Sequence, residues 1–142
     1  MAEALLIHKL ALMGVPTREV AVRSAGTRAV RGQPPDPRVI QLLDDAGIRP
    51  PRRNSRPLRR RDLEQADFVL AMETPHLDDL SRHHPLPPDL EIGLLGDYLP
   101  QGSAAIPDPH FGNLAGFERV YELIDTALDG FIEKSLLPRL TG

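Results

Sequence analysis

The chain has 142 residues, of which 41% are hydrophobic and 26% are charged. This composition is typical of one soluble globular domain, so we expect a single domain over residues 1–142. No apolar run approaches the ~20 residues that cross a bilayer, and Glu3 and His8 interrupt the apolar start, which excludes a secretory signal. We therefore expect a cytoplasmic protein with no membrane partner. The sequence contains no cysteine, which excludes disulfides, thiolate metal sites and a cysteine nucleophile within these residues.

Charge is divided unevenly along the chain. Residues 1–61 hold 13 lysines or arginines against 5 acidic residues, and residues 62–142 hold 4 against 15. The net charge of -3 therefore combines a half of +8 with a half of -11. Basicity is greatest in a segment free of acids that contains Arg49, Arg52, Arg53, Arg56, Arg59, Arg60 and Arg61. This segment is either a polyanion-binding patch or a solvated loop that pairs with the acidic half, and the lack of interleaved aromatic residues argues against nucleic acid.

Helical and strand-like segments alternate, which predicts an α/β fold with a mainly parallel sheet. The spacing of leucines predicts a helix over residues 2–13 that Gly14 ends. Residues 19–24 alternate polar residues with alanine or valine, as a short strand does. Asp36 as N-cap, Pro37 at the first helical position and Gly47 as the stop predict the next helix.

The second half of the chain continues the alternation. Residues 59–65 suit one helical turn, and residues 67–72 form an apolar run typical of a central strand covered on both faces. A helix over residues 74–82 and a strand over residues 90–95 follow. After a long loop over residues 96–113, apolar residues at helical spacing predict a long closing helix with one buried face: Phe117, Val120, Tyr121, Ile124, Leu128 and Phe131.

Two places carry candidate chemistry. Asp108 lies in the long loop, followed by Pro109, and is available as a general acid or base. Ser24 comes at the carboxyl end of a predicted strand, the edge at which open α/β sheets bind ligands. From the residues alone, both places are also ordinary turns.

Six blocks of sequence, in order and with matching gaps, resemble the low-molecular-weight protein tyrosine phosphatase family over essentially the whole chain. They are Met1-Ala2-Glu3-Ala4-Leu5-Leu6, Ser24-Ala25-Gly26-Thr27, Gly32-Gln33-Pro34-Pro35-Asp36-Pro37-Arg38, Ser55-Arg56-Pro57-Leu58, Leu70-Ala71-Met72-Glu73, and Asp108-Pro109-His110-Phe111-Gly112 with Phe117-Glu118-Arg119-Val120-Tyr121-Glu122 after it. The resemblance implies a three-layer α/β sandwich with a short parallel sheet.

The resemblance also implies site residues and a reaction. Asp108 takes the place of the general acid, Ser24 that of the serine that supports the phosphate loop, and His110 and Phe111 form the wall of the active site. The implied reaction is hydrolysis of phosphotyrosine on a protein, or of a small aryl phosphate, through a phosphocysteine intermediate and without a metal or cofactor. In the family, a first strand and a Cys-x5-Arg-Ser loop precede the Met-Ala-Glu-Ala block. We therefore expect that strand and loop to be absent from this chain, Met1 to be an internal methionine, and the 142 residues to be inactive.

Two alternatives remain open. In the first, the chain is a catalytically dead phosphatase-like binding module, which binds a partner or pairs with another copy as a homo-oligomer through exposed sheet edges. The other alternative is a polyanion binder that acts through residues 49–61.

Overall fold

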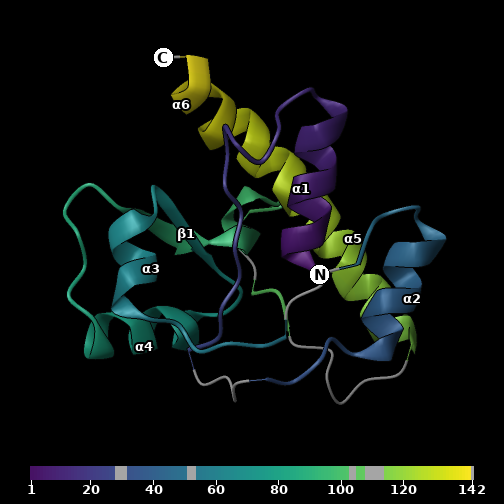
Figure 1. Ribbon diagram of the computed structural model, residues 1–142, viewed down its shortest axis with the longest axis horizontal. Coiled ribbons are helices and arrows are strands. Elements are labelled where there is room, and N and C mark those ends of the chain that lie inside the picture. The colour runs from purple at the N-terminus through teal and green to yellow at the C-terminus, as the bar shows by residue number, and fades with distance from the viewer. Residues whose placement is uncertain (28–31, 51–53, 103–104, 108–113, 142) are drawn as a thin grey trace.

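The computed structural model describes residues 1–27, 32–50, 54–102, 105–107 and 114–141. Its helices and strands are α1 (Ala2–Leu12), α2 (Pro37–Asp45), α3 (Arg60–Gln65), β1 (Phe68–Ala71), α4 (Thr74–His83), β2 (Glu91–Leu94), the 3₁₀ helix η1 (Leu95–Tyr98), α5 (Leu114–Phe131), the π-helical turn η2 (Ile132–Leu136) and α6 (Leu137–Thr141). Figure 1 shows the sheet between α3 and α4 on one side and α1, α2 and α5 on the other. The predicted α/β sandwich is confirmed.

The sheet is short and parallel. β1 pairs with β2 in a register that runs from Phe68 opposite Glu91 to Ala71 opposite Leu94. The helix α4 makes the crossover that two parallel strands require. Both strands were predicted, but the expectation of a central strand is wrong for the described residues, where β2 is the one partner of β1 and only Ala71 of β1 is buried.

The predicted strand over residues 19–24 is also wrong. Among the described residues this segment has no ladder, and the nearest pairing is an isolated bridge between Gly26 and Pro57. The amide of Gly26 donates to the Arg56 carbonyl at 3.0 Å, and its carbonyl accepts from the Leu58 amide at 2.9 Å. Val20 and Val22 nevertheless pack against the core. Glu19 and Val20 belong to a turn in which both amides donate to the Pro16 carbonyl, so the alternation reflects side chains that pack on the core from a turn and the irregular residues after it.

Local signals at the helix ends are confirmed. The Asp36 carboxylate accepts from the Arg38 amide at 2.9 Å and so caps α2. Gly14 and Gly47 follow α1 and α2 with φ angles of +78° and +73°, a left-handed conformation that glycine adopts without strain.

The closing helix runs further than its apolar pattern indicates. α5 buries one face, made by Phe117, Val120, Ile124, Ala127, Leu128 and Phe131. The helical path then continues through η2 and α6 to Thr141. Pro138 has no amide hydrogen and its ring crowds the carbonyl of Lys134, so the wider π turn just before it relieves a conflict that an α-helix would meet.

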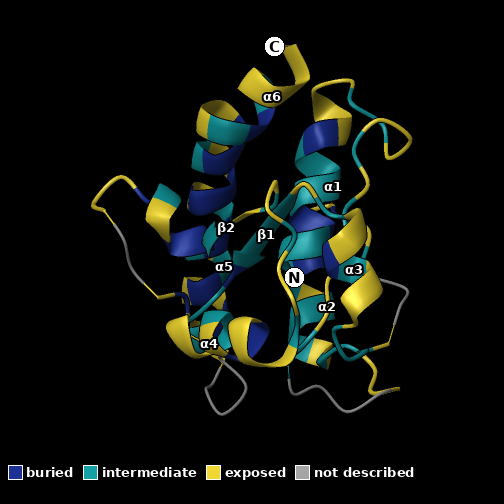
Figure 2. Cartoon of the chain, turned by 90° about the vertical axis from the view of Figure 1, so that its left-hand side faces the viewer, coloured by how far each residue is buried: buried dark blue, intermediate teal, exposed yellow. Residues whose placement is uncertain are grey.

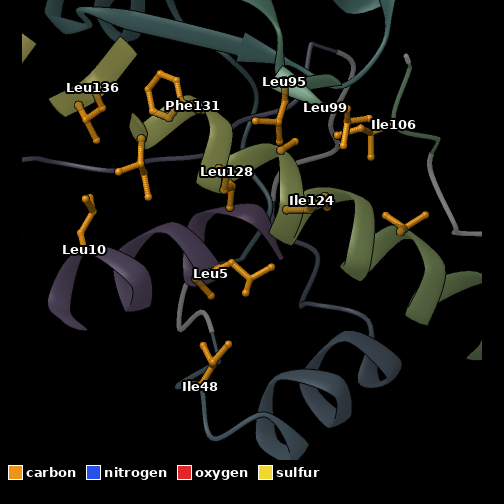
Figure 3. Packing of buried hydrophobic residues seen from close by; sticks show 14 of the residues in the cluster. Leu5, Leu10, Ile48, Leu95, Leu99, Ile106, Ile124, Leu128, Phe131 and Leu136 are labelled. Atoms are coloured by element: carbon orange, nitrogen blue, oxygen red, sulfur yellow. The ribbon is translucent and has the colours of Figure 1, made fainter. Parts of the chain in front are cut away.

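The core lies mainly between α1 and α5. Figure 3 shows Leu5 and Leu10 of α1 in the same cluster as Leu128 and Phe131 of α5. In Figure 2 the buried, dark blue residues of α5 lie toward the interior, whereas the end of α6 is exposed. The Lys9 ammonium adds a polar tie, with Nζ at 2.7 Å from both Asp125 and Asp129. Burial by itself would lower the pKa of Lys9, but the hydrogen bonds to the two carboxylates outweigh burial and raise it.

The contact between α5 and η1 predicts the effect of one substitution. A Cβ at Gly130 would overlap the backbone carbonyl oxygen of Tyr98 and lie 3.1 Å from the Tyr98 Cβ. Tyr98 is fixed here by a 2.7 Å hydrogen bond between its hydroxyl and that of Ser135, and by its edge contact with Phe131. We therefore expect Gly130→Ala to lower the free energy of unfolding by about 1–3 kcal/mol, as overpacking does. Urea denaturation monitored by circular dichroism measures this change.

An exposed position in the same helix gives the control. Thr126→Ala should leave stability unchanged or raise it slightly, because alanine is the better helix former and Thr126 is exposed. Since a glycine replaced by alanine in an open helical position stabilises by roughly 0.5–1 kcal/mol, a stabilised Gly130→Ala variant would contradict the close approach of α5 to η1.

Candidate functional site

A cavity of about 320 Å³ lies where three helices begin. Met1 and Ala2 at the start of α1, Asp36 at the start of α2 and Glu73 and His76 at the start of α4 line it. Its remaining lining residues are Val39, Met72, Ile106, Pro107, Phe117, Val120 and Ile124. Helix N-termini carry partial positive charge, so their convergence favours an anionic ligand.

The sheet positions one side of this cavity. β1 ends at Ala71, and Met72 and Glu73 follow at the carboxyl edge, where open parallel sheets bind ligands. The Met72 carbonyl accepts a 2.9 Å hydrogen bond from the Ile106 amide. That bond brings residues 105–107 over the strand end and places Pro107 against the cavity.

Asp36, an acidic residue of the cavity lining, is paired with a cation. Arg38 holds Asp36 with two contacts, Nη2 to Oδ2 at 2.9 Å and Nε to Oδ1 at 3.1 Å, and its guanidinium lies 4.2 Å from the centre of the Phe117 ring. The hydrogen bond with Asp36 raises the pKa of Arg38, so the guanidinium remains charged. The negative charge of Asp36 is thus matched by a fixed cation at the edge of the cavity.

His76 has a defined tautomer at the same place. Its Nδ1 accepts from the Glu73 backbone amide at 3.3 Å, which caps α4. A nitrogen that accepts carries no proton, so the neutral ring holds its proton on Nε2. Sequence reasoning missed both His76 and Glu73 as cavity residues. Their place just after a strand and at a helix start is the signal that points to them.

The residues predicted for the site are only partly described. The Ser24 hydroxyl donates to the Glu3 carboxylate at 2.9 Å, which places this exposed serine beside the first turn of α1, outside the set of cavity-lining residues. Asp108, His110 and Phe111 lie outside the described residues. Pro107, the residue before Asp108, lines the cavity.

Part of the arginine-rich segment is neutralised within the fold. Arg56 Nη1 lies 2.9 Å from Asp62 Oδ2, and Arg60 pairs with Glu64 at 3.0 Å. Asp62 also accepts from the Arg59 amide at 2.8 Å. The hydrogen bond from Arg56, aided by that from the Arg59 amide, holds the pKa of Asp62 below its usual value. Arg52 and Arg53 lie outside the described residues.

The comparison with known proteins decides the family. The model of the family described as low molecular weight phosphotyrosine protein phosphatase matches residues 1–138. This chain belongs to that family. A low molecular weight phosphotyrosine protein phosphatase of Schizosaccharomyces pombe is 31% identical over 88% of this chain and 81% of its own length. The human protein of the same name is 34% identical over 80% of this chain and 73% of its own length.

Solved structures show the same fold. The low molecular weight phosphotyrosine phosphatase from Vibrio cholerae is 26% identical, superposes with a TM-score of 0.82, and is matched over 93% of this chain and 84% of its own. A Drosophila arginine phosphatase is 28% identical with a TM-score of 0.81, over 93% of this chain and 86% of its own. The short parallel sheet and its helical layers are therefore the architecture of the phosphatase family.

Two further findings concern the described residues. None of the helices there is long and apolar enough to cross a membrane. In the same part of the chain, no three histidine, aspartate or glutamate side chains lie close enough together to hold a metal ion.

The Arg56–Asp62 pair predicts a pH-dependent contribution to stability in this phosphatase-family chain. Because the pKa of Asp62 is lower in the folded state, its contribution is complete above the unfolded pKa, about 4, and is lost as the pH falls through the folded pKa. We expect Asp62→Asn to destabilise the protein by about 1 kcal/mol at pH 7. The difference from the wild type should shrink toward pH 3. Thermal unfolding at both pH values measures it.

Glu64→Gln is the matched control. It removes a carboxylate from an exposed pair with Arg60 in the same helix, and such pairs contribute about 0.3–0.5 kcal/mol. If the difference in stability between Asp62→Asn and the wild type were the same at pH 7 and pH 3, the stabilisation would not come from the ionised carboxylate.

Proposed function

We propose that this chain is the part of a protein tyrosine phosphatase that binds the phosphorylated substrate and supplies the general acid, and that the 142 residues alone do not hydrolyse it. One observation carries the proposal. The family match extends over residues 1–138 and includes Asp108, while the same residues contain no cysteine.

The cavity supports the binding part of this function. Three helix N-termini face it, and a phosphate ester is an anion that they favour. Apolar side chains, among them Met72, Ile106 and Phe117, supply a surface on which an aromatic ring packs. A phosphotyrosine side chain combines these two features, an anionic end and an aromatic ring.

Asp108 serves as the acid in this proposal. When a cysteine thiolate attacks the phosphorus, the bond from phosphorus to the tyrosine oxygen breaks and Asp108 donates its proton to that oxygen. The products are a phosphocysteine and free tyrosine, and the Asp108 carboxylate then takes a proton from the water that hydrolyses the phosphocysteine. Ser24 supports the phosphate-binding region, and His110 and Phe111 form its wall.

The absence of cysteine from the sequence determines what the 142 residues do alone. Without a thiolate the first step has no nucleophile. Phosphate monoesters are among the slowest substrates to hydrolyse without catalysis, with enzymatic accelerations that reach about 10²¹, so an acid by itself gives no measurable turnover. The chain then acts as a phosphatase-like module that binds a phosphorylated ligand, in the cytoplasm and without a cofactor.

Kinetic assays of the purified 142-residue protein test this proposal. We expect no hydrolysis of p-nitrophenyl phosphate or of a phosphotyrosine peptide above that of the Asp108→Asn variant, with the Schizosaccharomyces pombe relative as the positive control. Isothermal titration should show that the phosphotyrosine peptide binds and that its unphosphorylated form does not.

The outcomes separate the two parts of the proposal. Turnover by the wild type that falls by about 10²–10⁴ in Asp108→Asn would overturn inactivity and retain the acid. Turnover that Asp108→Asn leaves unchanged would overturn both. A peptide that binds equally with and without its phosphate would refute the anion site and favour a binding module for an unmodified partner.

A further inference from the structure

A second concave surface lies at the opposite end of α1 from the cavity. It is a groove of about 420 Å³ between the end of α1 and the continuation of α5 through η2 and α6. Its lining residues are Lys9, Leu12, Met13, Asp129, Ile132, Glu133 and Leu137. None of them lines the cavity described above. Figure 1 shows the ends of α1 and α6 together at the top of the molecule, away from the start of α1.

The α1 wall of the groove exposes apolar side chains to water. Leu12 is 76% exposed and Met13 is 47% exposed, although both belong to the chemical type that folding normally buries. On the opposite wall Leu137 is half-buried and supplies apolar surface, whereas Ile132 lies mostly within the core. Two adjacent exposed apolar side chains beside a concave surface are a feature of protein-binding surfaces.

The acidic face of α5, which continues into η2, reaches the groove at Asp129 and Glu133, the two acids among its lining residues. It consists of Glu118, Glu122, Asp125, Asp129 and Glu133, which follow each other at steps of 4, 3, 4 and 4 residues and so share one side of the helix. Lys9 is engaged by two of these carboxylates at 2.7 Å. Within the described part of the chain, Glu118, Glu122 and Glu133 form no ion pair. The face therefore keeps a net negative charge.

We propose that this groove binds a cationic amphipathic helix of another protein. Leucine-like side chains of that helix insert between Leu12 and Met13 on one wall and Leu137 on the other, as in helix-in-groove recognition. Lysines or arginines on its flanks meet the acidic face of α5. From Asp129 to Leu137 the wall extends roughly 12 Å at 1.5 Å per residue, which accommodates about two turns of helix.

The charges favour this occupant over a second copy of the chain. In a second copy, the basic surface that could meet the acidic face is the arginine-rich segment near α3, and α3 lies on the other side of the sheet from α5 (Figure 1). Contacts between two different surfaces build open chains rather than a closed symmetric dimer. An anionic membrane is repelled by the carboxylates.

A designed peptide tests the proposal. The probe is a fluorescein-labelled, amidated 14-residue peptide with leucine at helical spacing and lysine elsewhere, and fluorescence anisotropy gives its Kd. We expect it to bind the full chain at least tenfold more tightly than a scrambled peptide of the same composition. It should also bind more tightly than a peptide that has glutamate in place of every lysine. Raising salt from 50 to 300 mM should weaken binding several-fold.

Paired variants locate the site. The double variant Leu12→Ser, Met13→Ser should weaken peptide binding about tenfold. A second double variant, Glu122→Lys with Glu133→Lys, should weaken peptide binding and reduce the salt dependence of the Kd. The matched controls are Leu86→Ser, another exposed leucine, and Asp45→Lys, an exposed acid of α2, which should leave the Kd unchanged. Because the substituted side chains are exposed, thermal melts should coincide with the wild type.

Amide chemical-shift mapping on the unsubstituted chain gives a second readout. We expect the largest changes at residues 9–13 and 129–137. Any one of three results would overturn the proposal. They are equal binding of the scrambled peptide, unchanged affinity in the Leu12→Ser, Met13→Ser variant, and chemical-shift changes centred on the cavity. A homodimer in light scattering that the double variant dissociates would also overturn it, because the groove would then be an interface between copies.

Discussion

The packing of α1 against α5 is the contact on which the rest of the structure depends. Two strands of four residues bury too little apolar surface to hold a domain together, and only Ala71 of β1 is buried. The side chains of α1, α5 and the turn after β2 form most of the core instead. Lys9 joins the two helices through Asp125 and Asp129 at the edge of this core, where the ion pairs fix how the helices lie.

The same helix pair separates two kinds of surface. At the start of α1, backbone amides and the positive end of the helix dipole face the cavity, together with Phe117 and Ile124 of α5. At the end of α1, carbonyl groups and the negative end of the dipole adjoin the groove and the acidic face of α5. The dipole of α1 therefore favours an anion at the beginning of the helix and a cation at its end.

The parts of the fold that were predicted from sequence are those that local chemistry determines. Asp36, Pro37 and Gly47 determine the limits of α2 through capping and backbone geometry, which act within a few residues. The segment over residues 19–24 has the side-chain pattern of a strand, but a ladder also needs a neighbour, and no local pattern supplies one. The cavity likewise arises from distant segments: the bond from the Ile106 amide to the Met72 carbonyl brings Pro107 to the cavity that His76 also lines. The acid Asp108 was found through the family resemblance, because an Asp-Pro pair by itself indicates only a turn.

In the described part of the chain, ion pairs between the basic half and the acidic half form at a few places. Arg56 and Arg60 pair with Asp62 and Glu64, their close neighbours in the chain. Arg139, from the acidic half, reaches Asp67 and Glu91 at 3.3 and 3.4 Å and ties α6 to the start of both strands. These pairs neutralise acids beside the sheet, whereas the acids of α5 face solvent, where the Lys9 ammonium is bound between two of the carboxylates. The arginine-rich segment thus loses part of the charge that a polyanion would need, whereas the acidic face of α5 keeps nearly all of its own.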